Sequence, residues 1–104
     1  MAQFDVHENT NHKTRKAIPY LLIVQADVLD ELATRVVVPL FAAAIMSKSA
    51  QHLNPAFTIN RTRVVMSTAE LAGIPAQALG KKVASLKEQR NEIIAALDFL
   101  ITGF

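Results

Sequence analysis

The first quarter of the chain alternates between apolar and polar stretches. In residues 3–8 the apolar Phe4 and Val6 alternate with polar side chains, which is the period of a half-buried β-strand. The polar stretch 9–16 is rich in Asn and Thr and predicts a loop. The apolar run 20–24 contains β-branched residues and lies between Pro19 and Asp27, so it predicts a central strand.

The middle of the chain favours extended structure, interrupted by one proline. Residues 35–41 include three consecutive valines, which favour a strand, and Pro39, which cannot donate to a sheet ladder. We therefore expect a strand with a bend or a sheet edge at Pro39. The alanine-rich residues 42–46 fit a helix and a strand equally, because five residues are too few to show a period.

A β-hairpin is predicted over residues 57–66. Its two apolar arms flank Asn60-Arg61-Thr62, and asparagine tolerates the left-handed backbone that a tight turn requires. The following residues 67–80 contain two glycines and one proline, so any helical turn at 69–72 must be short. A short strand around 76–79 also fits this segment.

The clearest predicted element is a helix from about residue 86 to residue 101. Ser85-Leu86-Lys87-Glu88 has the spacing of a capping box, in which the serine covers an orphan amide and the glutamate reaches back to the cap. Gly103 is a natural C-terminal stop. Phe99 lies opposite the apolar stripe, so its ring packs either within the monomer or at a subunit interface. The stripe, at about 100° per residue, consists of Leu86, Ile93, Leu97, Leu100 and Ile101.

Strands followed by one terminal helix predict a mostly antiparallel β protein with a helix packed on it. The 104 residues, of which 51% are hydrophobic, fit a single domain over residues 1–104. A domain this small buries a modest share of its surface, so a homodimer would add burial. The chain has no cysteine, which excludes disulfides, thiolate zinc sites and a cysteine nucleophile.

Charge and hydropathy predict a cytoplasmic protein that binds neither membranes nor nucleic acid directly. The net charge is +2, and eleven basic residues are scattered among nine acidic ones, as on a solvated surface. The longest apolar stretch, 36–46, is about half of the roughly 20 residues that span a bilayer. Residues 1–8 carry Asp5 and Glu8 and lack the pattern of a secretory signal.

No motif predicts a cofactor or a metal. The histidines His7, His12 and His52 lack the spacing that brings two imidazoles to one metal ion. Neither a glycine-rich phosphate loop nor a nucleophile elbow is present in the sequence. The feature that stands out instead is Phe104, an aromatic residue behind the flexible Gly103. It is either a frayed end or an anchor for a partner's pocket.

Seven stretches resemble, in their order and spacing, the CcdB toxins of plasmid and chromosomal toxin–antitoxin modules. The similarity covers nearly the whole chain, and its specificity lies in the combination of stretches. They are QFDV at 3–6, VQADVLD at 24–30, RVVVPL at 35–40, LNP at 53–55, MST at 66–68, GIP at 73–75 and RNEIIAALDFLITGF at 90–104.

The resemblance implies a homodimeric SH3-like antiparallel β-barrel of the CcdB/PemK type, with a short second sheet and a C-terminal α-helix. Such toxins bind the DNA gyrase A subunit, trap the gyrase–DNA cleavage complex and catalyse no reaction. They inhibit growth until a CcdA-type antitoxin, whose acidic arm folds on binding, neutralises them. Carried over position by position, gyrase binding is expected of Gln3, Phe4, His7, Ala26, Val28, Asp98, Thr102, Gly103 and Phe104.

The tail departs from that of the best-known family member, which has tryptophan and isoleucine where this chain has Thr102 and Phe104. Related members also carry threonine at the first of these positions. A tryptophan can stack on a cationic side chain and a threonine cannot, so the affinity for gyrase is expected to differ. His7 and Asp98 also replace different residues.

Two other functions are compatible with the sequence. An mRNA endonuclease of the same fold would need an acid–base pair and a cation around a phosphate, for which His12, Arg15 and Arg63 are the candidates. A nontoxic decoy would bind the antitoxin and not gyrase.

Overall fold

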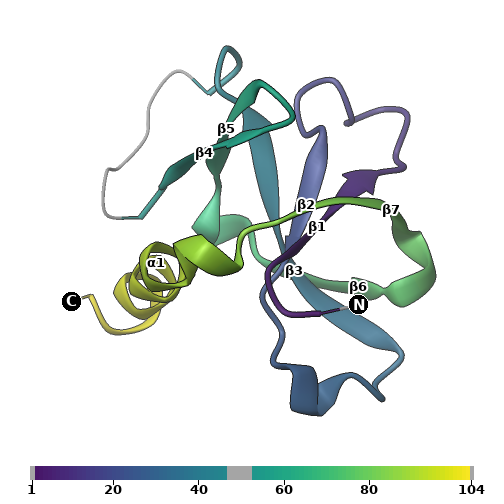
Figure 1. Cartoon of the computed structure of the whole chain (residues 1–104), viewed down its shortest axis with the longest axis vertical. Coiled ribbons are helices and arrows are strands. Elements are labelled where there is room, and N and C mark those ends of the chain that lie inside the picture. Colours follow the sequence, from purple (N-terminus) through teal and green to yellow (C-terminus); the bar gives the residue numbers. More distant parts are fainter. Residues whose placement is uncertain (1, 47–52, 104) are drawn as a thin grey trace.

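The computed structural model describes residues 2–46 and 53–103. Figure 1 shows a curved sheet and one helix, α1, which stands beside strands β4 and β5. Short 3-10 helices, η1 to η4, connect several of the strands. In chain order the elements are β1 (Asp5–Asn9), β2 (Tyr20–Ile23), η1 (Asp27–Leu29), β3 (Thr34–Ala42), β4 (Ala56–Ile59), β5 (Thr62–Met66), η2 (Thr68–Glu70), β6 (Ala72–Pro75), η3 (Ala76–Ala78), β7 (Leu79–Ser85), η4 (Lys87–Gln89) and α1 (Arg90–Thr102).

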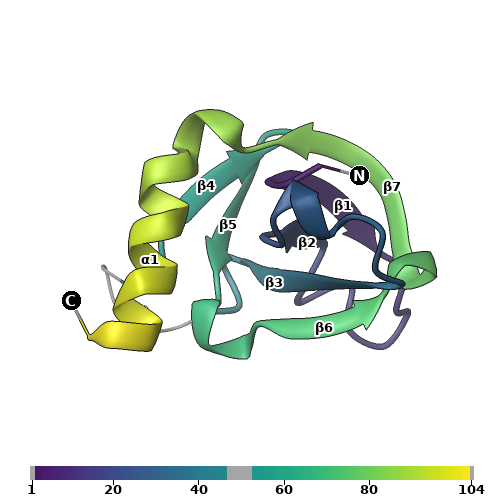
Figure 2. The same cartoon turned by 90° about the horizontal axis from the view of Figure 1, so that it is seen from below.

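The described strands form a seven-stranded antiparallel sheet in the order β4-β5-β3-β2-β1-β7, with β6 paired to β3. Figure 2 shows the sheet curled, with β7 bent around β1, where the register shifts twice. The predicted mostly β fold with a C-terminal helix is confirmed. The expected short second sheet is continuous with the main one, because the nine-residue β3 pairs with both β5 and β6 along one side.

Pro39 lies within the central strand β3, so the expected sheet edge at this residue is wrong. It is paired with Leu21 of β2, and on its other side its carbonyl accepts the N–H of Ser67 (3.0 Å). The nitrogen of a strand residue points to the same side as its carbonyl, so the missing donor faces β5 and β6. On this side of β3, residues 34–37 pair with β6 and residues 40–42 pair with β5, which leaves residues 38 and 39 between the two pairings. The proline occupies this gap and costs the sheet no ladder hydrogen bond.

The predicted hairpin is confirmed as β4 and β5. Its two-residue turn consists of Asn60 (φ 47°) and Arg61 (φ 68°), and positive φ at both positions defines a type I′ turn. Residues 42–46, whose sequence fits a helix and a strand equally, form neither element over their full length. Ala42 ends β3, and residues 43–45 form a turn.

The segment between the hairpin and α1 differs most from the prediction. A short helical turn is present as η2, but residues 76–78 form η3 where a strand is expected. The seven-residue β7 that follows is not predicted, because its lysines and small side chains show no clear alternation. Its partner β1 lies far away in sequence. At Gly80 the two strands run so close that an added Cβ would lie 2.7 Å from the Glu8 carbonyl oxygen.

The helix α1 begins at Arg90, later than predicted. Ser85 ends β7 and its hydroxyl accepts the N–H of Lys87 (3.3 Å), so the predicted capping box is wrong. The reason is tertiary: Leu86 donates its N–H to the Phe4 carbonyl (2.8 Å), which ties the chain to the sheet at the position where the helix is expected to start. At the other end Gly103 stops the helix with φ 81°, as predicted.

The buried face of α1 is centred on Ile93 and Ala96. Leu97 is partly buried, but Ile101 is 77% exposed, so its place in the predicted stripe is wrong. Ala96 is absent from that stripe, and its burial turns the contact face away from Ile101. Phe99, opposite the predicted stripe, is half-buried within the monomer.

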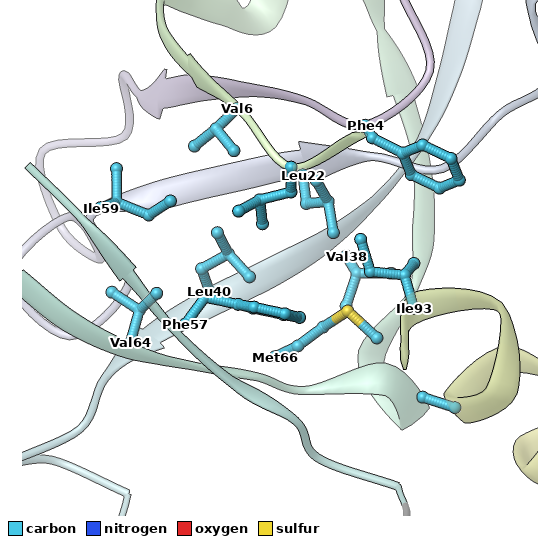
Figure 3. Close-up of a cluster of buried hydrophobic side chains, with 12 residues drawn as sticks. Phe4, Val6, Leu22, Val38, Leu40, Phe57, Ile59, Val64, Met66 and Ile93 are labelled. Carbon is cyan, nitrogen blue, oxygen red and sulfur yellow. The ribbon is translucent and has the colours of Figure 1, made fainter. Parts of the chain in front are cut away.

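The main core lies between the sheet and α1. Figure 3 shows side chains from β1 to β5 that meet Phe4 and Ile93 in one interior. Its buried members are Phe4, Val6, Leu22, Val38, Leu40, Phe57, Ile59, Val64, Met66, Leu86, Ile93 and Ala96. This core holds the N-terminal segment and the start of α1 in fixed positions relative to each other.

Candidate functional site

The predicted gyrase-binding residues occupy separate places in the structure. The first group, around the start of β1 and the turn η1, comprises Gln3, Phe4, Ala26 and Val28. The second group, at the end of α1, comprises Asp98, Thr102 and Gly103, and His7 lies apart in β1. Arg90 lies over Phe4, so the start of α1 is next to the first group. The second group is at the other end of this 13-residue helix, about 20 Å away, so one protomer presents two distinct surfaces.

The first surface is a loop, residues 26–33, that exposes large apolar side chains; we refer to it as the apolar loop. Val28 is 86% exposed, Leu32 51% and Leu29 47%. A cluster of exposed apolar residues is typical of a protein-binding surface. Leu29 and Leu32 are not among the predicted site residues, because an apolar loop residue can equally turn into the core.

Two buried polar side chains hold the apolar loop in place. Gln25 donates from Nε2 to the Leu29 carbonyl (3.0 Å) and accepts the Val36 N–H at Oε1 (3.0 Å). Arg35 donates from Nη2 to the Asp30 carbonyl (2.7 Å) and forms an ion pair with the carboxylate of the same residue (3.1 Å). Its Nη1 donates to the carbonyls of Leu32, in the loop, and of Thr34, the first residue of β3. The loop is therefore fixed from within the protein while its apolar side chains face solvent.

The second surface is the helix end, residues 98–103. Asp98, Thr102 and Gly103 are exposed there, next to the exposed Ile101. The Thr102 hydroxyl donates to the Asp98 carbonyl (2.7 Å), and the Gly103 N–H donates to the Phe99 carbonyl (2.9 Å). Phe104, also predicted for this site, lies outside the described residues.

Two predicted site residues are buried. Phe4 is 3% exposed, and its backbone has φ 71°, a conformation that is uncommon outside glycine. His7 is 6% exposed and its Nδ1 lies 2.8 Å from the Gly80 carbonyl oxygen of β7. Both side chains offer little surface to a partner and instead support the exposed residues around them. Their part in gyrase binding stays a prediction.

A polar groove of about 570 Å³ lies along the loop between β1 and β2. It brings together two of the three candidate nuclease residues, His12 and Arg15. Arg63 does not line it and instead donates to Thr58 within the hairpin (3.4 Å). The remaining lining residues are Glu8, Asn9, Thr10, Lys16, Pro19 and Tyr20. We refer to this feature as the basic groove.

The described part of the chain contains no group of three or more His, Asp or Glu side chains placed to hold a metal ion. His52, one of the three histidines considered above, lies outside the described residues. Over residues 2–46 and 53–103, no helix is long and apolar enough to cross a membrane.

The family of the chain follows from comparison with known proteins. A family model described as CcdB protein matches residues 3–103. The chain belongs to the CcdB family. It is thus a CcdB-type toxin–antitoxin protein, and the resemblance seen in its sequence is confirmed.

Several solved structures share the fold of this CcdB-family chain. An endoribonuclease in complex with its cognate antitoxin, from a mycobacterial species, matches with a TM-score of 0.76 and 15% identity over 97% of this chain and 94% of that one. The Mycobacterium tuberculosis toxin MazF-mt6 matches with a TM-score of 0.72 and 18% identity over 93% and 95%. A further mycobacterial endoribonuclease matches with a TM-score of 0.72 and 14% identity over 97% of this chain and 90% of that one. At these identities the likeness establishes the fold alone.

Proposed function

We propose that this CcdB-family protein is a toxin that binds the DNA gyrase A subunit and traps the gyrase–DNA cleavage complex. The family match over residues 3–103 carries the proposal. In this proposal the toxin catalyses no reaction, acts in the cytoplasm as a homodimer and is neutralised by a CcdA-type antitoxin. The residues proposed to bind gyrase are Gln3, Phe4, His7, Ala26, Val28, Asp98, Thr102, Gly103 and Phe104.

The two exposed surfaces support a mechanism based on binding. Val28 is 86% exposed, and burying such a side chain against a partner contributes about 2 kcal/mol. At the helix end Ile101 is 77% exposed beside the backbone of Gly103, which has no side chain to keep a partner away. Neither surface is needed to complete the core of the monomer, so both are available for a partner.

A homodimer would strengthen this mechanism. A two-fold dimer presents the apolar loop and the helix end twice each. The gyrase A subunits also form a dimer, so a symmetric toxin could repeat the same contacts on both of them, and the second contact would form at a high effective concentration. Light scattering coupled to size-exclusion chromatography tests this part of the proposal, since a purely monomeric toxin would contradict it.

The main test removes the tail. Deletion of residues 102–104 should abolish the accumulation of cleaved DNA in a gyrase reaction, because the exposed helix end is lost. The fold should persist, since the buried contacts of α1, at Ile93 and Ala96, lie upstream. Circular dichroism checks the fold of the truncated protein. A truncated chain that still poisons gyrase fully would overturn the proposal.

A matched pair of substitutions tests the apolar loop. Val28→Asp should weaken binding to the isolated gyrase A dimerisation domain by about tenfold or more, because it places a charge in an apolar contact. Ile45→Asp introduces the same charge at another exposed apolar residue, 57% exposed and outside the proposed site, and should leave the affinity unchanged. Failure of the unmodified protein to bind the domain would favour the nontoxic decoy.

The basic groove supports a second candidate function, an mRNA endonuclease. His12 and Arg15 line this groove together with Glu8, and an acid–base pair beside a cation is what phosphodiester cleavage requires. The solved structures that share the fold include endoribonucleases. Incubation of the pure protein with RNA decides between the two candidates: sequence-specific products, lost in His12→Ala and Arg15→Ala, would replace the gyrase proposal.

A further inference from the structure

A small pocket lies between the N-terminal segment and the start of α1. Its volume is about 240 Å³, and it is lined by Gln3, Phe4, Asp27, Lys87 and Arg90. In Figure 2 the N-terminal segment (purple) passes close to the turn η1 (blue), to which the Gln3 N–H is bound through the Asp27 carboxylate (2.7 Å). We refer to this feature as the Arg90 pocket. It adjoins the apolar loop, because Asp27 directly precedes Val28.

The Arg90 guanidinium lies over the ring of Phe4. Its guanidinium carbon lies 5.8 Å from the centroid of the Phe4 ring. The Phe4 backbone is tied on both sides: its N–H donates to the Ile23 carbonyl (2.7 Å) and its carbonyl accepts the Leu86 N–H (2.8 Å). A guanidinium that lies over an aromatic face leaves the N–H donors at its edge free, and these donors match a carboxylate in a bidentate geometry.

The charges lining the pocket favour an anion. Lys87 and Arg90 are exposed, and within residues 2–46 and 53–103 neither takes part in an ion pair. The single acidic side chain that lines the pocket is Asp27, one of whose oxygens already accepts the Gln3 N–H. Two cations therefore face one carboxylate, and the pocket carries a net positive charge.

We propose that the Arg90 pocket binds an aspartate or glutamate side chain of the protein partner that covers the apolar loop. A pocket of about 240 Å³ admits a single acidic side chain. The exposed Val28 and Leu29 beside it match the apolar centre of a protein interface, with the charged pocket at its polar rim. That this partner is gyrase rests on the function proposed above, whereas the affinity of the pocket for a carboxylate does not.

Titration of the isotope-labelled full chain with glutarate at constant ionic strength tests the ligand class directly. We expect saturable NMR shifts at the Gln3 amide and the Arg90 Nε–H. Arg90→Met keeps an apolar cover over Phe4 and should weaken glutarate binding about tenfold, and Lys87→Gln about threefold. Lys81→Met, at an exposed lysine of β7 outside the pocket, is the matched control and should bind as the unmodified chain does.

Three results of this titration would overturn the proposal. Shifts that do not saturate in the unmodified chain would show that there is no site. If folded Arg90→Met and Lys87→Gln proteins both bind glutarate as tightly as the unmodified chain does, the site lies elsewhere. Tighter binding of inorganic phosphate or of a short RNA than of glutarate would assign the pocket to a nucleic acid and not to an acidic protein side chain.

A second experiment asks whether the gyrase A dimerisation domain supplies the acidic group. Lys87→Glu should weaken binding of the domain about tenfold and reduce its dependence on salt, while Lys81→Glu should change neither. If Lys87→Glu binds the domain as tightly as the unmodified chain does, gyrase places no acidic group in the pocket. That result contradicts the proposal for this partner and leaves the proposed function standing. If the unmodified chain does not bind the domain, the proposed function fails, and the glutarate result alone decides the pocket.

Discussion

The apolar loop and the helix end both expose apolar side chains, but they are held by different kinds of contact. The loop depends on Gln25 and Arg35, two buried side chains that bond to its backbone. The helix end depends on bonds between residues four apart along α1, such as that of Thr102 to Asp98. The loop is thus a product of tertiary structure, whereas the helix end is a local structure. Substitutions that remove the contacts of the loop should therefore cost more unfolding free energy than substitutions at the helix end.

The largest expected effect is that of Arg35→Met, which removes the charged side chain that anchors the apolar loop. The free energy of unfolding should fall by about 2 to 3 kcal/mol, because the carbonyls of Asp30, Leu32 and Thr34 lose their charged donor and the Asp30 carboxylate loses its ion pair. Urea denaturation measures this change. Arg63→Met, at an exposed arginine of β5, is the control and should cost less than about 0.5 kcal/mol. A loss below 1 kcal/mol for Arg35→Met would mean that the loop does not depend on this anchor.

Gln25→Leu should have the next largest effect. It leaves the Val36 N–H and the Leu29 carbonyl without their side-chain partner, at a cost of about 1 to 2 kcal/mol. Amide hydrogen exchange should quicken in residues 27–30 and stay unchanged in α1, because the two regions are held independently. Equally faster exchange in both regions would show that the loop and the helix end are not held independently.

Gly103→Ala should destabilise the helix end by about 1 kcal/mol. Gly103 has φ 81°, which alanine adopts with strain, although no atom lies within 4 Å of the added Cβ. Gly73→Ala is the matched control, since it too has open space around it but no positive φ, and it should leave stability nearly unchanged. The comparison is made by thermal unfolding, and equal effects of the two substitutions would argue against backbone strain as the cause.

Thr102→Val should have the smallest effect. It removes the hydrogen bond from the Thr102 hydroxyl to the Asp98 carbonyl on an exposed turn, which should change the free energy of unfolding by less than about 0.5 kcal/mol. Urea denaturation measures it beside Arg35→Met. A loss as large as that of Arg35→Met would show that the helix end also has a tertiary role.

Elements specified by neighbouring residues could be predicted from the sequence. The hairpin is encoded by two apolar arms around a turn at Asn60 that takes positive φ. The helix and its stop at Gly103 follow from apolar spacing and a glycine in the left-handed region. Where a distant partner decides, prediction fails: Ser85 reads as a helix cap but ends β7, because Phe4 binds the next residue, Leu86.

The candidate site shows the same division. The exposed helix end follows from the position of Thr102 and Gly103 after the last buried turn of α1. The burial of Phe4 and His7 and the exposure of Leu29 could not be predicted, because burial depends on what lies across the sheet. The Arg90 pocket joins three segments that are distant in sequence, and no local pattern indicates it.

The sequence by itself determined the mostly β class, the β4–β5 hairpin, the terminal helix with its glycine stop, and the resemblance to CcdB toxins. Those features depend on side-chain period and backbone preference over a few residues. Only the tertiary structure decided that Pro39 fits inside the sheet, that β7 closes on β1, and that Arg35 holds the apolar loop open to solvent. Each of these rests on a hydrogen bond or a packing contact whose partner the chain supplies from elsewhere, which a local pattern cannot specify.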